Sequence, residues 1–449
     1  MKVAIRQTEL RVLNMHSRMP FRYGIATMTA LPHLFVRVLL ELDGHQQWGI
    51  AADHLPPKWF TKDPQTLFRD EIDSMLAVIT QACQFATELP AAPTVFTFWQ
   101  QLYARQKAWA AGTAYPPLLW GFGVSLVERA LLEAFCRATG QPFATALRTG
   151  ALGIDFTGPP PLRKIIVRHT VGLGDLLTGP GSIVDGLPQS LAASIRGYGL
   201  THFKIKLGGN PDSDFARLQQ IAAILPAKYA CTLDGNEQYP DLDAFARFWE
   251  TVRSEQSLVK FLRHLIFVEQ PLPRAVAFQH PLTTWPDRPP IIIDESDAEL
   301  TSFATALDLG YAGTSHKNCK GVFKSITNTT LAKKRGAILS SEDLSNVGPV
   351  ALLQDLAVVA ALGIPHAERN GHHYFRGLSL APEETLAHHG DLYRRHDHGF
   401  VTLNIQRGCV AVDSVVAAPF GVAFEVDVNQ LTPLADWRVE SLDLSHCGT

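Results

Sequence analysis

The sequence predicts an α/β protein in which a (β/α)8-type barrel is combined with an α+β capping domain. Between residues 164 and 380, short apolar runs alternate with amphipathic helical patterns, and the alternation gives eight runs. Both ends of the chain instead show the alternating polar and apolar residues that are typical of antiparallel strands. A capping domain built from the N-terminal region and the C-terminal segment would explain this difference.

The N-terminal region mixes strand and helix patterns. Residues 34–42 indicate a strand that ends at the Asp43-Gly44 turn, and residues 46–52 indicate its hairpin partner. Apolar residues recur at helical spacing over 124–138, and Gly140 is placed to end that helix. A glycine and three prolines at 158–161 mark a boundary. We therefore expect a capping domain at 1–157, a barrel at 158–389 and a returning C-terminal segment at 390–449.

The barrel region is defined by its apolar runs. Amphipathic helical stretches, such as residues 215–225 and 242–252, separate neighbouring runs, which is the pattern of parallel βαβ units. Periodicity alone also allows an open doubly wound sheet, but the number of repeats favours the barrel. The runs are 164–171, 202–207, 231–233, 265–268, 291–293, 312–316, 337–340 and 365–368.

The C-terminal segment returns to strand-like alternation at residues 400–405 and 422–428. We expect both stretches to be strands. We also expect this segment to pack back on the N-terminal region.

Composition excludes several classes of partner. The 449 residues are 46% hydrophobic and carry a formal net charge of −3, so nothing indicates nucleic acid or an anionic membrane. The six cysteines are scattered without a CxxC pair, which favours reduced thiols and a cytoplasmic location. No apolar signal region or membrane span is evident. We expect the chain to assemble with further copies of itself as a homo-oligomer.

Polar and charged residues follow five successive apolar runs. The carboxyl ends of barrel strands meet at one mouth, so these side chains would converge in a single cleft. One carboxylate at such a position is usually a helix cap or a solvated loop charge. Several on consecutive strands need another explanation, because neighbouring buried carboxylates repel each other unless a cation lies between them. The residues are Lys204, Lys206, Asp234, Asn236, Glu269, Asp294, His316 and Lys317.

The three carboxylates predict a metal site. Asp234, Glu269 and Asp294 carry the hard oxygen ligands that Mg²⁺ prefers, and Mn²⁺ accepts the same ligands. A divalent cation between them would offset both their mutual repulsion and their desolvation.

The lysines predict acid–base chemistry. Lys204 and Lys206 point to the same side of one strand, and adjacent ammonium groups lower each other's pKa. A lysine that becomes neutral is a usable general base. Lys317 would approach from the opposite face, four strands further round. A cation between two bases suits removal of the proton beside a carboxylate, because it neutralises the charge of the enediolate.

In their order and spacing, these motifs resemble the enolase superfamily, and more closely its mandelate racemase and muconate lactonizing enzyme branch. Residues 19–24 also resemble that family's mobile substrate-covering loop, so the resemblance extends over nearly the whole chain. The matching pieces are Lys204-Ile205-Lys206, Asp234-Gly235-Asn236, Val268-Glu269-Gln270-Pro271, Asp294-Glu295-Ser296 and Lys317 before Gly321.

The resemblance implies a capped barrel that holds Mg²⁺ and acts through an enolate, as a racemase, epimerase, cycloisomerase or syn-dehydratase. It implies that Asp234, Glu269 and Asp294 are metal ligands. It makes Lys206 the base on one face and Lys317 the group on the other. Lys204 would tune Lys206 or bind the substrate carboxylate.

Several assignments stay open at this point. Counting back from Gly321 also allows His316 in place of Lys317, and Lys320 is expected to be a loop charge. Asn236, His316, His366, Glu368 and Tyr23 are candidate substrate contacts. A second metal site at His366, His372 and His373 is a further hypothesis that the irregular spacing does not favour.

Two other functions stay possible on sequence alone. One is a Schiff-base barrel lyase that uses Lys206 as its nucleophile. The other is a non-catalytic barrel that binds a ligand or a partner.

Overall fold

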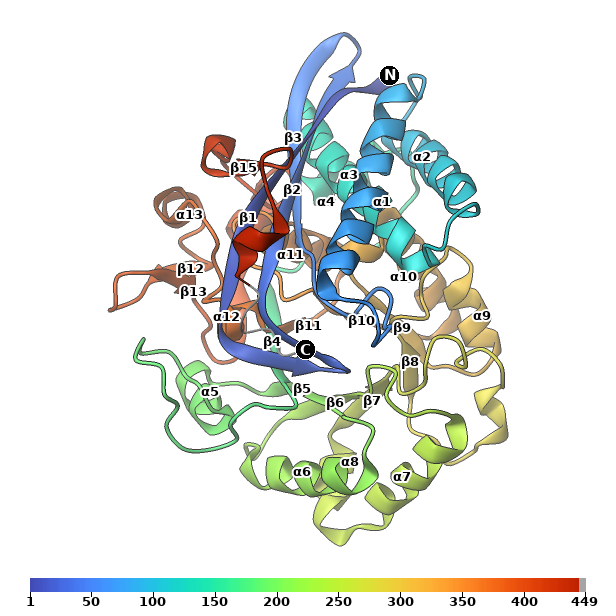
Figure 1. Cartoon of the computed structure of the whole chain (residues 1–449), viewed down its shortest axis with the longest axis vertical. Coiled ribbons are helices and arrows are strands. Elements are labelled where there is room, and N and C mark those ends of the chain that lie inside the picture. Colours follow the sequence, from blue (N-terminus) through green and yellow to red (C-terminus); the bar gives the residue numbers. More distant parts are fainter. Residues whose placement is uncertain (444–449) are drawn as a thin grey trace.

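The N-terminal strands form an antiparallel sheet in the computed structural model, which describes residues 1–443 (Figure 1). β1 (Val3–Tyr23), β2 (Ala26–Leu42) and β3 (His45–His54) pair in sequence order. The β2–β3 turn is at Asp43 and Gly44, which both have positive φ, so the predicted hairpin is confirmed. Near the other end of the chain, β15 (Thr432–Pro433) pairs with the free edge of β1.

Three long helices cover one face of this sheet (Figure 1). They are α1 (Phe68–Glu88), α2 (Val95–Ala110) and α3 (Pro117–Thr139). α3 is buried on nearly all sides because it contacts both β3 and the other two helices. It begins with a proline, whose missing N–H costs nothing there, and ends at the predicted Gly140 with φ 63°. The short α4 (Phe143–Arg148) follows it.

Eight parallel strands form the barrel in consecutive order, and β4 pairs with both β5 and β11. All eight predicted apolar runs become strands. The doubly wound alternative is wrong, because a doubly wound sheet reverses its strand order at a switch point and this sheet does not. The strands are β4 (Lys164–Val171), β5 (His202–Lys206), β6 (Ala230–Asp234), β7 (Leu265–Glu269), β8 (Ile291–Ile293), β9 (Gly313–His316), β10 (Ile338–Ser341) and β11 (His366–Arg369).

Helices surround the barrel and connect its strands (Figure 1). The long interval between β6 and β7 holds α7 and a further short helix, α8. The helices after α4 are α5 (Leu191–Tyr198), α6 (Pro211–Ile224), α7 (Leu242–Ser254), α8 (Val259–Arg263), α9 (Ser302–Asp308), α10 (Val322–Arg335), α11 (Ala351–Leu362), α12 (Gly371–Tyr374), α13 (Pro382–His388) and α14 (Asp413–Ala417).

The C-terminal segment differs in part from its prediction. β12 (Tyr393–Arg395) pairs with β13 (Val401–Leu403), within the expected strand at 400–405, and β14 (Cys409–Ala411) pairs with β4 of the barrel. The strand expected at 422–428 is wrong, since this stretch is irregular. Arg137 donates to the carbonyls of Val422 and Phe424, so a side chain takes two acceptors that a sheet would use.

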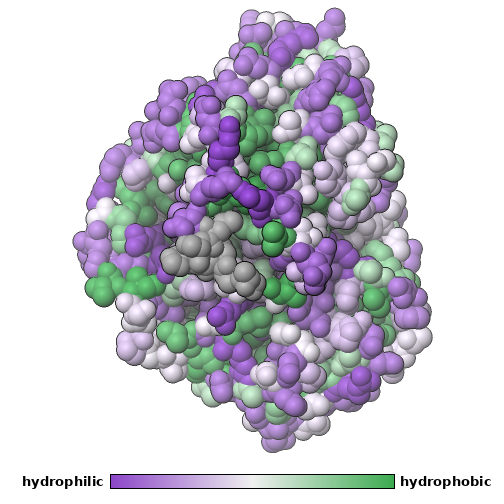
Figure 2. Space-filling view, viewed as in Figure 1, coloured by the Kyte–Doolittle hydropathy of each residue, from purple (hydrophilic) through white to green (hydrophobic). Residues whose placement is uncertain are grey.

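The surface gives no sign of a membrane helix. Hydrophilic side chains predominate around the rim of the face in Figure 2, with smaller apolar areas toward its middle. No helix within residues 1–443 has the length and apolar character needed to cross a membrane. The five cysteines in that range are free thiols, and Cys447 lies outside the described residues.

Close packing of α3 on α1 predicts unequal effects at two glycines of one helix. A Cβ at Gly123 would lie 2.3 Å from the carbonyl oxygen of Val78, whereas a Cβ at Gly121 meets nothing within 4 Å. Gly123→Ala should therefore lower the free energy of unfolding by about 1–3 kcal/mol through overpacking. Gly121→Ala should raise it by up to about 1 kcal/mol through helix propensity. Urea denaturation measures both, and equal effects would contradict this packing.

Candidate active site at the barrel mouth

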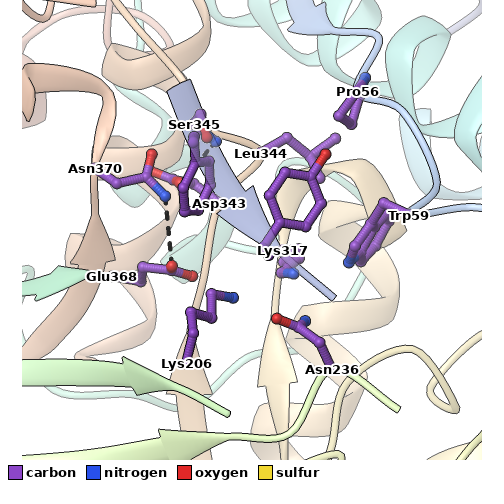
Figure 3. Close-up of a pocket in the computed structure, with 12 residues that line it drawn as sticks. Pro56, Trp59, Lys206, Asn236, Lys317, Asp343, Leu344, Ser345, Glu368 and Asn370 are labelled. Carbon is purple, nitrogen blue, oxygen red and sulfur yellow. Dashed lines mark hydrogen bonds between the residues drawn. The ribbon is translucent and has the colours of Figure 1, made fainter. Parts of the chain in front are cut away.

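A cavity that is partly open to solvent, with about 370 Å³ of empty space, lies between the carboxyl ends of the barrel strands and the cap (Figure 3). Its barrel side is polar, whereas the cap contributes aromatic and apolar side chains. Lys206, Asn236, Lys317, Asp343, Leu344, Ser345, Glu368 and Asn370 line it from the barrel, and Phe21, Tyr23, Pro56 and Trp59 line it from the cap.

Lys204 lies beneath this cavity and is surrounded by acids. Its ammonium nitrogen is 2.7–3.0 Å from carboxylate oxygens of Asp234, Glu269, Glu342 and Glu368, and its side chain is 1% exposed. Burial opposes the charge, but the four carboxylates outweigh burial and raise the pKa of Lys204 well above its ordinary value. Lys204 is therefore a permanent cation, not a base.

Lys206, one pleat further along β5, reaches the cavity. Its Nζ donates to Asp234 Oδ2 at 2.6 Å. Burial tends to raise the pKa of Asp234, but the two lysines outweigh this and lower it. Both lysines point to the same side of β5, and Lys206, two residues nearer the carboxyl end of the strand, lies at the cavity wall, whereas Lys204 lies in the charged core.

Asp294 has two lysine partners on its other side. Lys317 Nζ lies 2.7 Å from Asp294 Oδ2, and Lys320 Nζ lies 3.0 Å from Oδ1. Although burial favours the neutral acid, these ammonium groups hold the pKa of Asp294 well below its usual range. Burial would lower the pKa of Lys317, but Asp294 outweighs it and the pKa is raised. The expectation that Lys320 is a loop charge is wrong, because its side chain is 2% exposed.

Glu269 is the least neutralised of the three predicted metal ligands. Burial, and next the neighbouring Asp234 and Glu342, raise its pKa well above the ordinary value. Lys204 is the cation that it contacts, and Lys204 is shared with three other acids.

The donor chemistry suits a hard divalent ion, but the arrangement does not. Throughout residues 1–443, no three His, Cys, Asp or Glu side chains are grouped so that they could hold a metal ion. Asp234 and Glu269 share the ammonium of Lys204, and Asp294 is paired with Lys317 and Lys320. The structure thus gathers the three predicted ligands around lysines, and their role as metal ligands stays a prediction.

His316 and Lys317, the two candidates for the catalytic group at the end of the sixth strand, have different surroundings. Lys317 lines the cavity, and its Nζ lies 4.3 Å from the ring centroid of Trp59. His316 is buried outside the cavity lining, and its Nδ1 is 2.7 Å from Ser325 Oγ on α10. Because side chains alternate along a strand, only one of two neighbours can face the barrel mouth.

Some of the predicted substrate contacts line the cavity and others do not. Tyr23, Asn236 and Glu368 line the cavity. Tyr23 does so with its ring, since its hydroxyl donates to the carbonyl of Pro57. The expectation for His366 is wrong: it is the first residue of β11 and lies against Arg168 and His202, at the strand's amino end.

Sequence reasoning missed Glu342 and Arg168, which complete the charged core. Arg168 donates to Glu342, and both side chains are fully buried. The one signal was a charged residue inside the apolar run 164–171. Glu342 follows the seventh run, at a position where a carboxylate is usually a helix cap.

A separate group of buried histidines lies beside β4. His169 Nδ1 is 3.3 Å from His372 Nε2, and His373 is 3.9 Å from Asp175. They are not grouped with other ligands as a metal site would require, in the described part of the chain. The hypothesis of a second metal site at His366, His372 and His373 is therefore wrong. Burial is the main cause that lowers the pKa of His169 and of His373 to about 3.

Comparison with known families gives one match. Residues 187–414 match the family model described as enolase C-terminal domain-like. That range includes all three predicted metal ligands and the three predicted catalytic lysines. A search of curated protein sequences gives no match.

Solved structures share the fold at low sequence identity. A mandelate racemase/muconate lactonizing protein from Herpetosiphon aurantiacus is 18% identical, with a TM-score of 0.65 over 94% of this chain and 99% of that one. The muconate lactonizing enzyme of Mycobacterium smegmatis, complexed with muconolactone, is 19% identical, with a TM-score of 0.62 over 100% of both chains. A dipeptide epimerase from Enterococcus faecalis, complexed with Mg and L-Leu-L-Tyr, is 16% identical, with a TM-score of 0.60 over 91% and 100%.

The buried histidines predict a loss of stability in acid. Below pH 6.5 the unfolded chain binds protons at these rings, whereas the folded chain does not until about pH 3. The free energy of unfolding should therefore fall as pH falls from 6.5 toward 3, by up to about 1.4 kcal/mol per pH unit for each histidine.

Urea denaturation between pH 7 and 4.5 measures this slope. His169→Gln should make it shallower, whereas His280→Gln, at an exposed position, should leave it unchanged. An unaltered slope in His169→Gln would count against a neutral buried ring.

Proposed function

This chain belongs to the family described as enolase C-terminal domain-like, and on that premise we propose that it is an isomerase or lyase that removes the proton alpha to a substrate carboxylate. The proposal includes racemisation, epimerisation, cycloisomerisation and syn-elimination. The related structures are a muconate lactonizing enzyme, an epimerase and a mandelate racemase/muconate lactonizing protein, which supports this reaction class.

One observation carries the proposal: two lysines reach the same cavity from opposite sides of the barrel (Figure 3). Lys206 ends β5 and Lys317 follows β9, and these strands are four apart in an order of eight. In a barrel of eight strands, such strands face each other across the axis. A substrate carbon between the two amines is accessible from both faces.

Each amine has one close carboxylate, which is Asp234 for Lys206 and Asp294 for Lys317. Asp294 keeps Lys317 protonated, which makes Lys317 the group able to donate a proton. Lys206 is then the candidate acceptor on the other face. Positive charge from both sides would stabilise the negative charge that develops on the substrate carboxylate as its α-proton leaves.

Dependence on Mg²⁺ or Mn²⁺ is a further part of the proposal. It is supported by the oxygen donors of Asp234, Glu269 and Asp294 and by the Mg in the epimerase structure. Lys204, Lys317 and Lys320 now contact these oxygens, so a divalent cation would compete with them. The homo-oligomeric state and the cytoplasmic location also stay predictions.

Deuterium exchange tests the proposed reaction directly. A panel of carboxylic acids is incubated with the protein in heavy water, with and without Mg²⁺, and α-deuterium is measured by NMR. At least one acid should exchange. Lys206→Ala should slow its exchange by about 10²–10⁴-fold, as expected for loss of a general base. Lys334→Ala, at an exposed position on α10, is the control and should keep the wild-type rate.

Other outcomes would favour the alternatives. Activity that survives a chelator and is trapped at Lys206 by borohydride would indicate a Schiff base. If no acid in a broad panel exchanges under either condition, the proposed reaction is contradicted, and a binding function becomes the better explanation.

A further inference from the structure

Lys62 connects the cap to the barrel at the edge of the cavity. It lies in the loop between β3 and α1, and its side chain is 14% exposed. Its Nζ donates to the backbone carbonyl of Asn236, in the loop after β6. It is also 3.2 Å from Glu237 Oε2 and 3.8 Å from Glu295 Oε1. One cap cation therefore contacts the loops that follow two barrel strands.

The two carboxylates depend on this contact to different degrees. Glu237 has a second cation, because Arg274 donates to both of its oxygens. Glu295 is fully buried, and in the part of the chain described Lys62 is the cation that lies within 4 Å of it. A buried carboxylate without a cation is strongly disfavoured. When the cap loop packs against the barrel, Lys62 therefore supplies a cation for the carboxylate of Glu295, which belongs to the barrel.

Asn236 is held between these groups. Its Nδ2 donates to Glu295 Oε1 at 3.2 Å, and its backbone carbonyl accepts from Lys62. Its Oδ1 has no hydrogen-bond partner among residues 1–443, although it is buried. Figure 3 shows this oxygen on the side of the cavity that holds Lys206 and Lys317. The contact with Glu295 therefore leaves a free acceptor directed at the space between the two amines.

The contact between Lys62 and the loop after β6 involves strained backbone conformations in both segments. Lys62, Asn236 and Glu237 have φ values of 59°, 40° and 65°, in the left-handed region that non-glycine residues rarely adopt. Such conformations persist where surrounding contacts fix them, and they concentrate at functional sites.

The tip of the β1–β2 hairpin also meets Lys62. A Cβ placed on Gly24 would lie 3.4 Å from both Cε and Nζ of Lys62. Arg274 of the barrel donates to the carbonyls of Trp59 and Phe60 in the same cap loop. Both cap segments that close the cavity, the hairpin tip and the loop with Trp59, therefore come together where Lys62 enters the barrel.

We propose that Lys62 is a positioning residue that orients Asn236 only when the cap is seated, and so couples closure of the cavity to a correctly set active site. This inference rests on the proposed function for its kinetic consequence. Its structural part does not depend on any substrate. An exchange experiment on the backbone can therefore test it alone.

Hydrogen–deuterium exchange of the free protein gives the first test. In Lys62→Met, amides of residues 235–239 should exchange at least about tenfold faster, because the loop that carries Asn236 loses its cap contact. Lys62→Arg keeps a cation of similar reach and should restore protection. Lys62→Gln is the second variant if Lys62→Met does not fold, and it should behave like Lys62→Met.

Lys58→Met is a matched control. Lys58 lies in the same loop and also has positive φ. Within residues 1–443 its side chain bonds to groups of the cap, namely Glu71 and the carbonyls of Asp63 and Thr66. Its loss can loosen the cap loop but should leave exchange at 235–239 within twofold of wild type. Equal exchange at 235–239 in Lys62→Met and wild type, or an equal rise in Lys58→Met, would overturn the inference.

Kinetics separate positioning from simple stability. With an acid found to undergo α-deuterium exchange, Lys62→Met should lower kcat more than it changes KM, and Lys62→Arg should recover kcat. An unchanged kcat in a folded Lys62→Met would overturn the coupling to chemistry. If exchange at 235–239 responds as expected while no acid reacts, only the proposed function fails.

Discussion

The structure of the barrel mouth depends on ion pairs that neutralise buried charges. Lys204 is the centre of this arrangement, because its ammonium contacts acids from four other strand ends or the loops that follow them. Removal of one partner from a buried ion pair leaves an uncompensated charge and costs about 3–5 kcal/mol. The acids and Lys204 therefore hold one another in place. The contacts of Lys204 thus link the ends of β5, β6, β7 and β11 at the mouth.

The number of nearby carboxylates distinguishes the roles of the lysines. Lys204 faces four acids and stays charged, whereas Lys206 and Lys317 each have one close carboxylate and border the cavity. Lys320 is a second cation on Asp294, so this carboxylate keeps a cation even when Lys317 contacts a substrate. At the edge of the cap, Lys62 likewise provides a cation for a buried carboxylate of the barrel, Glu295.

The fold could be predicted because each barrel strand is a short apolar run between helices, and because strand ends must meet at one mouth. That rule also brought Lys206, Asn236 and Lys317 to one cavity. It failed for Lys320, because a 3-10 turn at Asn318–Lys320 directs this side chain back to Asp294. It failed for His366 because a residue near a strand can lie at either end. Ion-pair partners from distant strands, such as Arg168 with Glu342, leave no local pattern in the sequence.

Charge balance finally explains why a cation matters for the proposed reaction. The charged core combines five carboxyl groups with five cations, and burial favours the neutral acid at one of the five, Glu269. The groups are Asp234, Glu269, Asp294, Glu342 and Glu368 with Arg168, Lys204, Lys206, Lys317 and Lys320. A substrate carboxylate that enters the cavity adds a further negative charge. It must then compete with Asp234 and Asp294 for Lys206 and Lys317, or bring positive charge with it, because unpaired buried charge is disfavoured. When a substrate carboxylate binds, the ion pairs of this core therefore have to rearrange unless the ligand brings its own cation.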